Sequence, residues 1–425
     1  MNNKTLTKNS NKLWTRDFTI ITIGSIISML GNAVSGFAVG LVVLDYTNST
    51  FLYALFMVVY NLPKIVVPLF AGPYLDRFSR KKVIYTLDFL SAAIYTGIFL
   101  FINSGNFSYG ILIIVSLFIG LIDGIYMVAY DSFYPNLISE GNFSKAYSIS
   151  SMIYPLSAFM VPVASFIYNS MGTAAYLFLF NAISFFIAAC FEATIKYKET
   201  HMSKEEQKGF DFKGYRDDFK EGLSYIWGEK GLLVITVYFC LTMFAGNATQ
   251  TVLLPFFKNN PQLFTKSTID VVTLFTFVTG CGVIGRLIGG MIHYKFKYPT
   301  SKKFMIAITV YMSISIIEAI QLFLPVKIMM LCFFITGIMG VTSYNIRISA
   351  TQSYVPDDNR GRFNGIFNMI CAAGGILGQL LGGGMAEFIS ERSVTVIFSI
   401  FNIFAVIFVM YRGREYVKKI YNRKV

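Results

Sequence analysis

Charged side chains are scarce in this chain of 425 residues, where Asp, Glu, Lys and Arg together make up 14%. An average soluble domain contains about 25%. Hydrophobic residues make up 55%. A soluble protein of this length cannot cover its surface with so few charges, so the composition excludes a soluble enzyme or DNA-binding protein. It predicts a polytopic membrane protein.

Residues that bind metals or carry out catalysis are also few. The chain has two histidines, and its five cysteines lie in apolar stretches without a C-x-x-C pair. The signatures H-E-x-x-H, G-x-S-x-G and G-x-x-x-x-G-K-[ST] are missing from the sequence, which argues against a metalloprotease, a serine hydrolase and an ATP-driven pump. We therefore expect no metal site, no cofactor and no enzymatic activity.

Long apolar runs are abundant instead. A bilayer-spanning helix needs about 20 mostly apolar residues. About twelve such runs are present, at residues 18–44, 50–70, 83–103, 109–130, 147–168, 174–195, 231–255, 268–292, 304–324, 327–347, 364–388 and 393–411. The expected fold is all-α, with two six-helix halves at 1–195 and 231–425. A densely charged cytoplasmic loop at 196–230 joins them.

Two pairs of similar segments indicate that the halves are repeats. AYDSFYPN ends the fourth predicted helix and ATQSYVPD ends the tenth, which places Pro135 and Pro356 221 positions apart. Gly72 and Gly290, at the ends of the second and eighth predicted helices, are 218 positions apart. The nearly equal offsets favour a duplicated six-helix unit, an architecture found among secondary transporters.

The net charge of +13 is unevenly distributed along the chain. With both termini in the cytoplasm, 30 Lys and Arg residues fall on that side of the membrane and 4 on the other. This asymmetry predicts that both termini are cytoplasmic, and it assigns the basic residues to a membrane surface rather than to nucleic acid. The Lys-, Asn-, Ile-, Phe- and Tyr-rich composition is typical of a bacterial plasma or inner membrane protein.

The loop after the second predicted helix reads AGPYLDRFSRKK. It fits the pattern G-x-x-x-D-R-x-G-R-K, except that Ser79 replaces the second glycine; the matching residues are Gly72, Asp76, Arg77, Arg80 and Lys81. With this loop in the expected place, the chain resembles transporters of the major facilitator superfamily. The segments GSIISMLGNAVSGFAVGLVVLDYTNST, KKVIYTLDFL and SYVPDDNRGRFNGI resemble its drug-exporter branch, which includes macrolide and enterobactin exporters.

The resemblance implies that this loop is a conformational latch. In the family, the carboxylate equivalent to Asp76 meets the N-terminal end of helix 11, which here follows Arg362, because a helix dipole favours an anion there. Arg77 or Arg80 is expected to pair with Asp131 at the end of the fourth predicted helix. The contacts are expected to bias the outward-facing state.

Ionisable residues inside the predicted helices are costly and usually face a cavity or a partner. Asp123, in the cavity-lining fourth helix, is the proton-coupling or substrate-contact candidate; the alternative is a structural ion pair with Lys64 or Arg286. Asp88 is expected to have a structural role, and Glu318 lies on a peripheral helix. Polar substrate-cavity candidates, for which interhelical hydrogen bonding is the alternative, are Asn32, Asn247, Gln250, Tyr344 and Asn345.

Two departures from the exporter branch concern the first and fifth predicted helices. Asn32 stands where such exporters often have an acid, and residues 161–166 degrade the antiporter signature G-P-x-x-G-G. Glycines at i, i+4 and i+8 (Gly374, Gly378, Gly382) and at i and i+4 (Gly285, Gly289) predict closely packed helices. Such packing serves either moving or static interfaces.

The function expected from these observations is secondary active transport. The chain should export small amphipathic molecules across the lipid bilayer as a monomer, by alternating access and in exchange for protons. Transport of a lipid, peptide or metabolite by uniport or import is the alternative within this class. A membrane sensor on the same fold is the alternative outside it.

Overall fold

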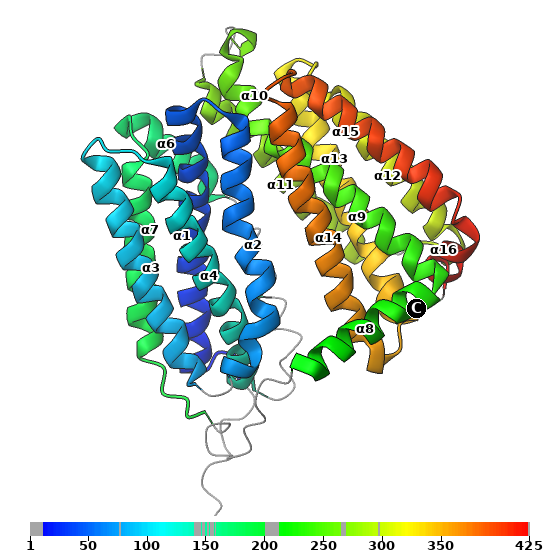
Figure 1. Ribbon diagram of the computed structural model, residues 1–425, viewed down its shortest axis with the longest axis horizontal. Helices are drawn as coiled ribbons and strands as arrows, with labels where there is room; N and C mark the ends of the chain where they lie inside the picture. Colours follow the sequence, from blue (N-terminus) through cyan, green and yellow to red (C-terminus); the bar gives the residue numbers. More distant parts are fainter. Residues whose placement is uncertain are drawn as a thin grey trace, which may run out of the picture. The chain divides into compact units, whose positions relative to one another are not determined.

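A computed structural model describes residues 12–75, 78–139, 146, 149–150, 153, 157, 159–199, 212–264, 269–295 and 298–423. The described residues contain eleven helices that are long and apolar enough to cross a membrane. Each overlaps one of the predicted spans, so the all-helical membrane fold is confirmed (Figure 1). The remaining predicted span, 147–168, lies largely outside the described residues, and α6 (Met160–Met171) covers its end.

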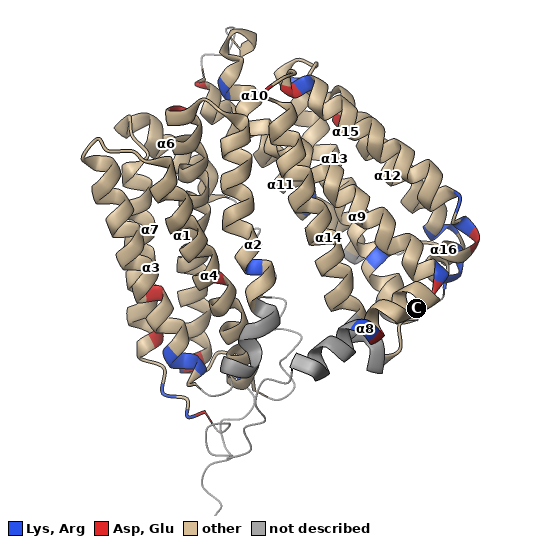
Figure 2. Cartoon of the chain, viewed as in Figure 1, with Lys and Arg blue, Asp and Glu red and all other residues tan. Residues whose placement is uncertain are grey.

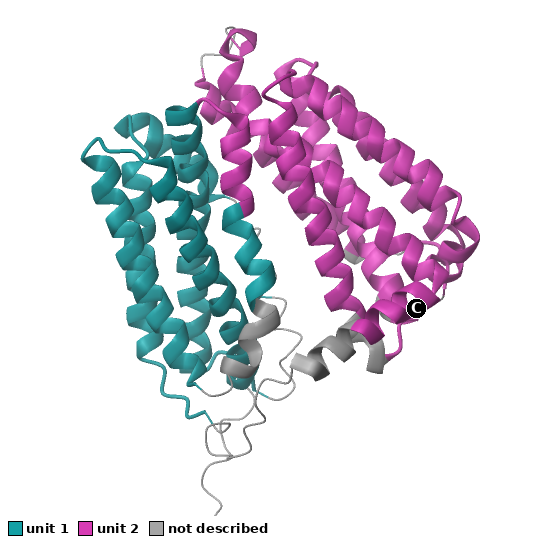
Figure 3. Ribbon diagram, viewed as in Figure 1, with its two compact units in different colours: residues 1–47, 59–210 teal, residues 48–58, 211–425 magenta. Residues whose placement is uncertain are grey.

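The chain forms two compact units (Figure 3). Unit 1 comprises residues 1–47 and 59–210, and unit 2 comprises residues 48–58 and 211–425. The helices of unit 1 besides α6 are α1 (Arg16–Thr47), most of α2 (Thr50–Leu75), α3 (Arg80–Asn103), α4 (Tyr109–Phe133), η1 (Tyr134–Leu137) and α7 (Ala175–Ala193).

Unit 2 begins with the first turns of α2 and continues after residue 210. Its helices are α8 (Phe212–Gly228), α9 (Lys230–Thr251), α10 (Leu253–Asn259), η3 (Pro261–Phe264), α11 (Val271–Lys295), η4 (Thr300–Lys302), α12 (Lys303–Gln321), α13 (Val326–Tyr354), α14 (Asp357–Met385), α15 (Glu391–Ala405), η5 (Val406–Tyr411) and α16 (Arg414–Tyr421). Charged residues are sparse along the helices and gather near helix ends, as on α16 (Figure 2).

Specific contacts explain why the start of α2 belongs to unit 2. The Glu387 carboxylate, just after α14, accepts hydrogen bonds from Ser49 Oγ and from the backbone N–H of Phe51, both at 2.7 Å. An acid at a helix N-terminus satisfies free N–H groups and is favoured by the helix dipole. Gly383 of α14 leaves room for Ala54, where a side chain would collide. The first turns of α2 are therefore docked on the end of α14.

Local sequence sets several helix ends. Serine side chains accept a backbone N–H at the starts of α3, α4 and α15, where the residues are Ser79, Ser108 and Ser390. Such N-caps satisfy donors that have no partner within the helix. At the other end of α6, Gly172 takes a left-handed conformation with φ 66°, which glycine adopts without a Cβ penalty.

Equivalent asparagines join equivalent helices in the two units. In unit 1, Asn181 Nδ2 of α7 donates to Ser35 Oγ of α1 at 2.7 Å, and Ser35 Oγ donates to the Tyr95 hydroxyl of α3 at 3.4 Å. In unit 2, Asn402 of α15 accepts from Thr242 of α9 at 3.1 Å and donates to Ser315 of α12 at 2.9 Å. Asn181 and Asn402 are 221 positions apart, the same offset as the two prolines, which supports a duplicated unit.

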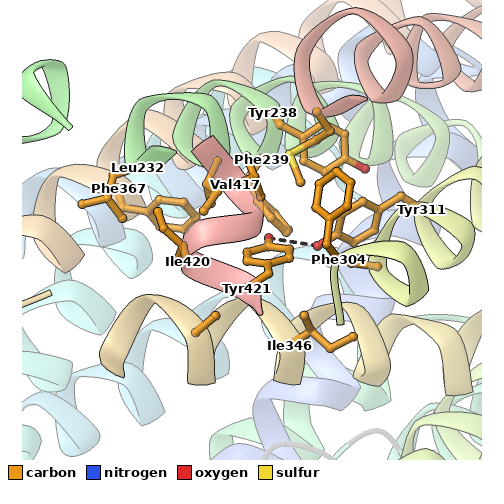
Figure 4. Close-up of a cluster of buried hydrophobic side chains, with 14 of the residues drawn as sticks. Leu232, Tyr238, Phe239, Phe304, Tyr311, Ile346, Phe367, Val417, Ile420 and Tyr421 are labelled. Carbon is orange, nitrogen blue, oxygen red and sulfur yellow. Dashed lines mark hydrogen bonds between the residues drawn. The ribbon is translucent and has the colours of Figure 1, made fainter. Parts of the chain in front are cut away.

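Each unit has its own apolar core. In unit 2, the largest cluster brings α16 against α9, α12 and α13 (Figure 4). Within it the hydroxyls of Tyr311 and Tyr421 lie 3.1 Å apart. Burial raises the pKa of Tyr421, which lies beyond the last spanning helix, well above its ordinary value, so this phenol stays protonated. The amphipathic α16 is thus held through one buried face.

Candidate functional site

An ion pair joins α2 and α4 inside unit 1. Lys64 Nζ lies 2.7 Å from Asp123 Oδ2, with the two side chains 28% and 15% exposed. The Tyr60 hydroxyl donates to the same oxygen at 3.2 Å, and Lys64 Nζ lies 3.7 Å from the Tyr60 ring centroid. Tyr60 and Lys64 are one turn apart on α2 and therefore share a face. Of the two cations foreseen as ion-pair partners of Asp123, Lys64 is the one that lies beside it.

Glycines on either side of Asp123 bring the two helices together. A Cβ at Gly120 would collide with the Tyr60 carbonyl oxygen, and one at Gly124 would lie 3.2 Å from the carbonyl oxygen of Pro63. Without these side chains α4 approaches the α2 backbone, and the short Asp123 side chain can reach Lys64. Burying a charge inside a membrane helix is tolerable when a partner neutralises it.

Two further acids are buried in unit 1, and among the described residues neither forms an ion pair. Asp88 of α3 is 1% exposed and Glu192 of α7 is fully buried. Each of the two carboxyl groups acts electrostatically on the other. Ser28 donates to Asp88 Oδ2 at 3.2 Å, and Tyr126 donates to Glu192 Oε1 at 3.5 Å. Within the described part of the chain, Glu192 Oε2 has no hydrogen-bond partner.

Glu192 was missed in the sequence because it stands four residues before the charged loop that begins at Lys196. Its apolar flanks, FFIAACF before it and Ala193 after it, place it within the predicted span and were the available signal. Gly24 of α1 completes the site, since a Cβ there would lie 2.7 Å from Glu192 Oε1. Asp88, expected to be structural, thus belongs to a buried pair of acids.

Replacing Glu192 by glutamine should preserve or raise the stability of the protein, whereas Glu192→Ala should lower it by about 2–4 kcal/mol. Glutamine keeps an acceptor for Tyr126 and removes one of two adjacent acids from an apolar interior. Alanine leaves a cavity and an unsatisfied hydroxyl. Thermal unfolding in detergent, followed by circular dichroism, measures both. Equal losses in the two variants would mean that an ionised Glu192 carboxylate is required.

The predicted latch is only partly described. Asp76 and Arg77 lie outside the described residues, and neither the surroundings of Gly72 nor the side chain of Arg362 is described. Arg80 Nη1 donates to the Ser132 carbonyl at 3.0 Å, next to the exposed Asp131 at the end of α4. The arginine is therefore attached to the end of α4, where the latch prediction placed it, through a backbone oxygen.

An unforeseen acid holds the start of α3. The Glu199 carboxylate accepts from Ser79 Oγ at 2.6 Å and from the backbone N–H groups of Arg80 and Lys81 at 2.9 and 3.1 Å. Lys81 Nζ donates to the Ile195 carbonyl at 3.0 Å. An anion is favoured at a helix N-terminus. Glu199 therefore anchors the segment after α7 to the latch loop, which no local pattern in the sequence indicates.

The polar substrate-cavity candidates fall into both units. In unit 1, Asn32 of α1 has a buried Oδ1 without a hydrogen-bond partner among the described residues. In unit 2, Asn247 of α9 accepts from Gln379 of α14 at 3.3 Å and donates to the Met243 carbonyl at 2.9 Å, an interhelical contact of the kind foreseen as its alternative.

The other candidates in unit 2 make fewer described contacts. Gln250 of α9 is exposed and Asn345 of α13 is half-buried, while the Tyr344 side chain is 55% exposed. Of the remaining charged candidates, Arg286 on α11 is exposed and Glu318 on α12 is half-buried.

Arg347, the last residue of the predicted span 327–347, is a further intramembrane charge. The apolar span in fact runs over Val326–Thr351 and contains it. Its guanidinium carbon lies 4.7, 5.0 and 5.4 Å from the ring centroids of Phe367, Phe239 and Tyr344. Three helices of unit 2 thus surround one cation with aromatic faces, a favourable arrangement.

A family profile described as Major Facilitator Superfamily matches residues 21–319 and 297–424. The chain belongs to this superfamily. It is a polytopic membrane transporter, and the superfamily resemblance seen in the sequence is confirmed. YkuC, an uncharacterised MFS-type transporter of Bacillus subtilis (strain 168), is 26% identical over 294 residues, which span 66% of each chain.

Solved structures of superfamily-like transporters share the fold. A mutant of the nucleoside transporter NupG is 12% identical with a TM-score of 0.73, over 93% of this chain and 99% of that one. A bacterial homologue of the lysosomal transporter Spinster is 13% identical with a TM-score of 0.66, over 96% and 98% of the two chains. A bacterial homologue of the iron transporter ferroportin is 11% identical with a TM-score of 0.66, over 96% and 100%. At these identities the likeness extends to the fold alone.

Proposed function

We propose that this superfamily member is a proton-coupled efflux antiporter that moves small amphipathic molecules by alternating access. It acts as a monomer in a bacterial plasma or inner membrane, with both termini in the cytoplasm. The observation that carries the proposal is the Lys64–Asp123 ion pair inside unit 1. The drug-exporter resemblance of the loop and helix segments supports the direction of transport.

The ion pair has the properties that proton coupling requires. Both side chains are partly exposed, at 28% and 15%, and the proposal requires a proton to reach Asp123 from this exposed side. Protonation of the carboxylate removes its attraction to Lys64. That attraction is worth roughly 4 kcal/mol for charges about 4 Å apart near a protein surface. A single proton therefore changes both the charge and the contacts between α2 and α4.

The latch loop is the proposed second component. In this proposal Asp76, Arg77 and Arg362 close the cytoplasmic side, while Arg80 and Lys81 hold the loop on the end of α4 and on the segment after α7. The described contacts of Arg80 with Ser132 and of Lys81 with Ile195 are consistent with this holding role. Opening of the latch would then accompany the inward-facing state of the transport cycle.

Replacing Asp123 by asparagine should abolish the dependence of transport on a proton gradient while leaving substrate binding intact. Asparagine still accepts the Tyr60 hydrogen bond but cannot take up a proton. The measurement is uptake of fluorescent drugs, metabolites and lipids into proteoliposomes under an imposed pH gradient. Asp45→Asn is the matched control, because this exposed acid lies near one end of α1 and accepts from Tyr168 at 2.7 Å.

Three results would contradict parts of the proposal in different ways. Gradient-dependent transport by Asp123→Asn would remove Asp123 from the coupling site. Wild-type transport that ignores the gradient would exclude antiport and favour uniport or import of a lipid, peptide or metabolite. Ligand binding without any flux would identify a sensor.

A further inference from the structure

The Arg347 guanidinium of unit 2 has different surroundings from the Lys64 ammonium group of unit 1. Lys64 has a carboxylate at 2.7 Å. Among the described residues, no carboxylate lies within ion-pair distance of Arg347, and its guanidinium donates no hydrogen bond. An unpaired charge in a spanning helix is costly and usually marks a functional position.

Aromatic rings hold this side chain in place without using its N–H groups. The rings of Phe239 and Phe367 are themselves buried, at 5% and 4% exposure, and belong to the core cluster of Figure 4. They come from α9 and α14, so the guanidinium is fixed between neighbouring helices. A guanidinium stacked on rings keeps its planar fork of donors, the geometry that binds carboxylate and phosphate groups through two hydrogen bonds.

One face of α13 next to Arg347 is open among the described residues. Gly340, Tyr344 and Arg347 stand at i, i+4 and i+7, which places them along one side of the helix. A Cβ at Gly340 would meet no atom within 4 Å, and the Tyr344 side chain is 55% exposed. Gly340 and Arg347 lie roughly 10 Å apart along the helix axis. Along this distance the helix surface has open space at Gly340, then the exposed ring of Tyr344, and then the guanidinium of Arg347.

We infer that Arg347 and Tyr344 form a binding site for an aromatic organic anion. The carboxylate or other acidic group of the ligand pairs with the guanidinium of Arg347, and its ring stacks on Tyr344. The site deepens the proposed function by naming the substrate class, and it rests on that function for its role in transport. Binding itself requires neither a proton gradient nor flux.

Equilibrium dialysis of the detergent-solubilised full chain with naphthoate and with its neutral analogue naphthylmethanol tests this site. Arg347→Gln should weaken naphthoate binding about tenfold or more and leave naphthylmethanol binding nearly unchanged, because only the anion uses the guanidinium. Arg347→Lys, which keeps the charge but loses the planar fork, should give an intermediate value. If Arg347→Gln does not fold, Arg347→Lys still tests whether naphthoate binding requires the planar guanidinium.

Arg414→Gln is the matched control. Arg414 also lies over a ring, 4.9 Å from the Tyr411 centroid, but on α16 outside the spanning helices and exposed. Its replacement should not change naphthoate binding. Equal naphthoate affinity in wild type and Arg347→Gln, or equal weakening of both ligands, would overturn the anion site.

A lipid phosphate could supply the same chemistry as a free organic anion, so a second arm separates the two. Wild type and Arg347→Gln are placed in vesicles of phosphatidylcholine, with or without phosphatidylglycerol. If only phosphatidylglycerol raises the unfolding temperature of wild type over the variant, and naphthoate does not bind, the small-anion proposal is wrong. If naphthoate binds through Arg347 but no proton gradient drives any flux, the anion site stands and the antiport mechanism fails.

Discussion

Replacing Lys64 by methionine should destabilise the protein more than replacing Lys64 and Asp123 together. The single change leaves the Asp123 carboxylate in a spanning helix with the Tyr60 hydroxyl as its hydrogen-bond donor among the described side chains. Removing one partner of a fully buried pair costs about 3–5 kcal/mol. Since these side chains are 28% and 15% exposed, we expect a smaller loss of about 2–3 kcal/mol. Methionine keeps the apolar volume of the lysine stem, so lost packing contributes little.

A double-mutant cycle isolates the pair. Asp123→Asn alone should cost less than Lys64→Met, because the ammonium group remains over the Tyr60 ring at 3.7 Å and can reach water. The variant with both changes carries no unpaired charge, so it should recover part of the stability lost in Lys64→Met. Thermal unfolding of the four proteins in detergent gives the coupling energy, expected at about 1–2 kcal/mol. A coupling energy of zero would mean that the ion pair contributes nothing to stability.

The helices could be predicted from sequence because the signal is local. Hydropathy over about 20 residues depends on the side chains of one segment and not on their partners. For the same reason one helix end differs clearly from its prediction. Predicted span 327–347 stops at Arg347, whereas α13 runs on to Tyr354. The helix continues because Ile346 and Ala350 are buried in the core of unit 2, and it ends before Pro356, which disfavours helix in the preceding residue.

The contacts between side chains of different helices in the site could not be predicted from hydropathy. The sequence predicts Lys64 or Arg286 as the ion-pair partner of Asp123. In the structure the partner is Lys64, because Gly120 and Gly124 let α4 approach the backbone of α2. Glu192 was overlooked because an acid near the end of a span resembles the loop that follows. Its burial becomes evident only once Gly24 of α1 is seen to make room for it. To predict which residues of two helices contact each other, one must therefore also know how the helices are aligned against each other.

Small residues are an exception, since their spacing did anticipate a contact between helices. Gly374, Gly378 and Gly382 lie along one face of α14, and side chains there would meet Cys240, Phe244 and Ala248 of α9. The three residues of α9 repeat at the same i, i+4 and i+8 spacing. Because α9 and α14 belong to one compact unit and touch at backbone atoms, the contacts support the static reading of this glycine face.

Gly378→Val should therefore strongly destabilise unit 2. A Cβ at Gly378 would overlap the Phe244 carbonyl oxygen, and backbone atoms cannot move aside as a flexible side chain can. Overpacking typically costs about 1–3 kcal/mol, and more where the backbone must shift. We expect a loss of at least about 3 kcal/mol, or no monodisperse protein on size-exclusion chromatography in detergent.

Gly365→Ala, in the same helix, should act in the opposite direction. No atom lies within 4 Å of a Cβ placed at Gly365, so alanine there meets no steric cost and gains about 0.8–1.0 kcal/mol of helix propensity. Thermal unfolding of the two variants side by side tests the contact itself. If Gly378→Val unfolded at the temperature of Gly365→Ala, α9 and α14 would have to lie further apart than their glycine-to-carbonyl contacts allow. A loss confined to Gly378→Val means that the packing of these two helices depends on glycine at that position.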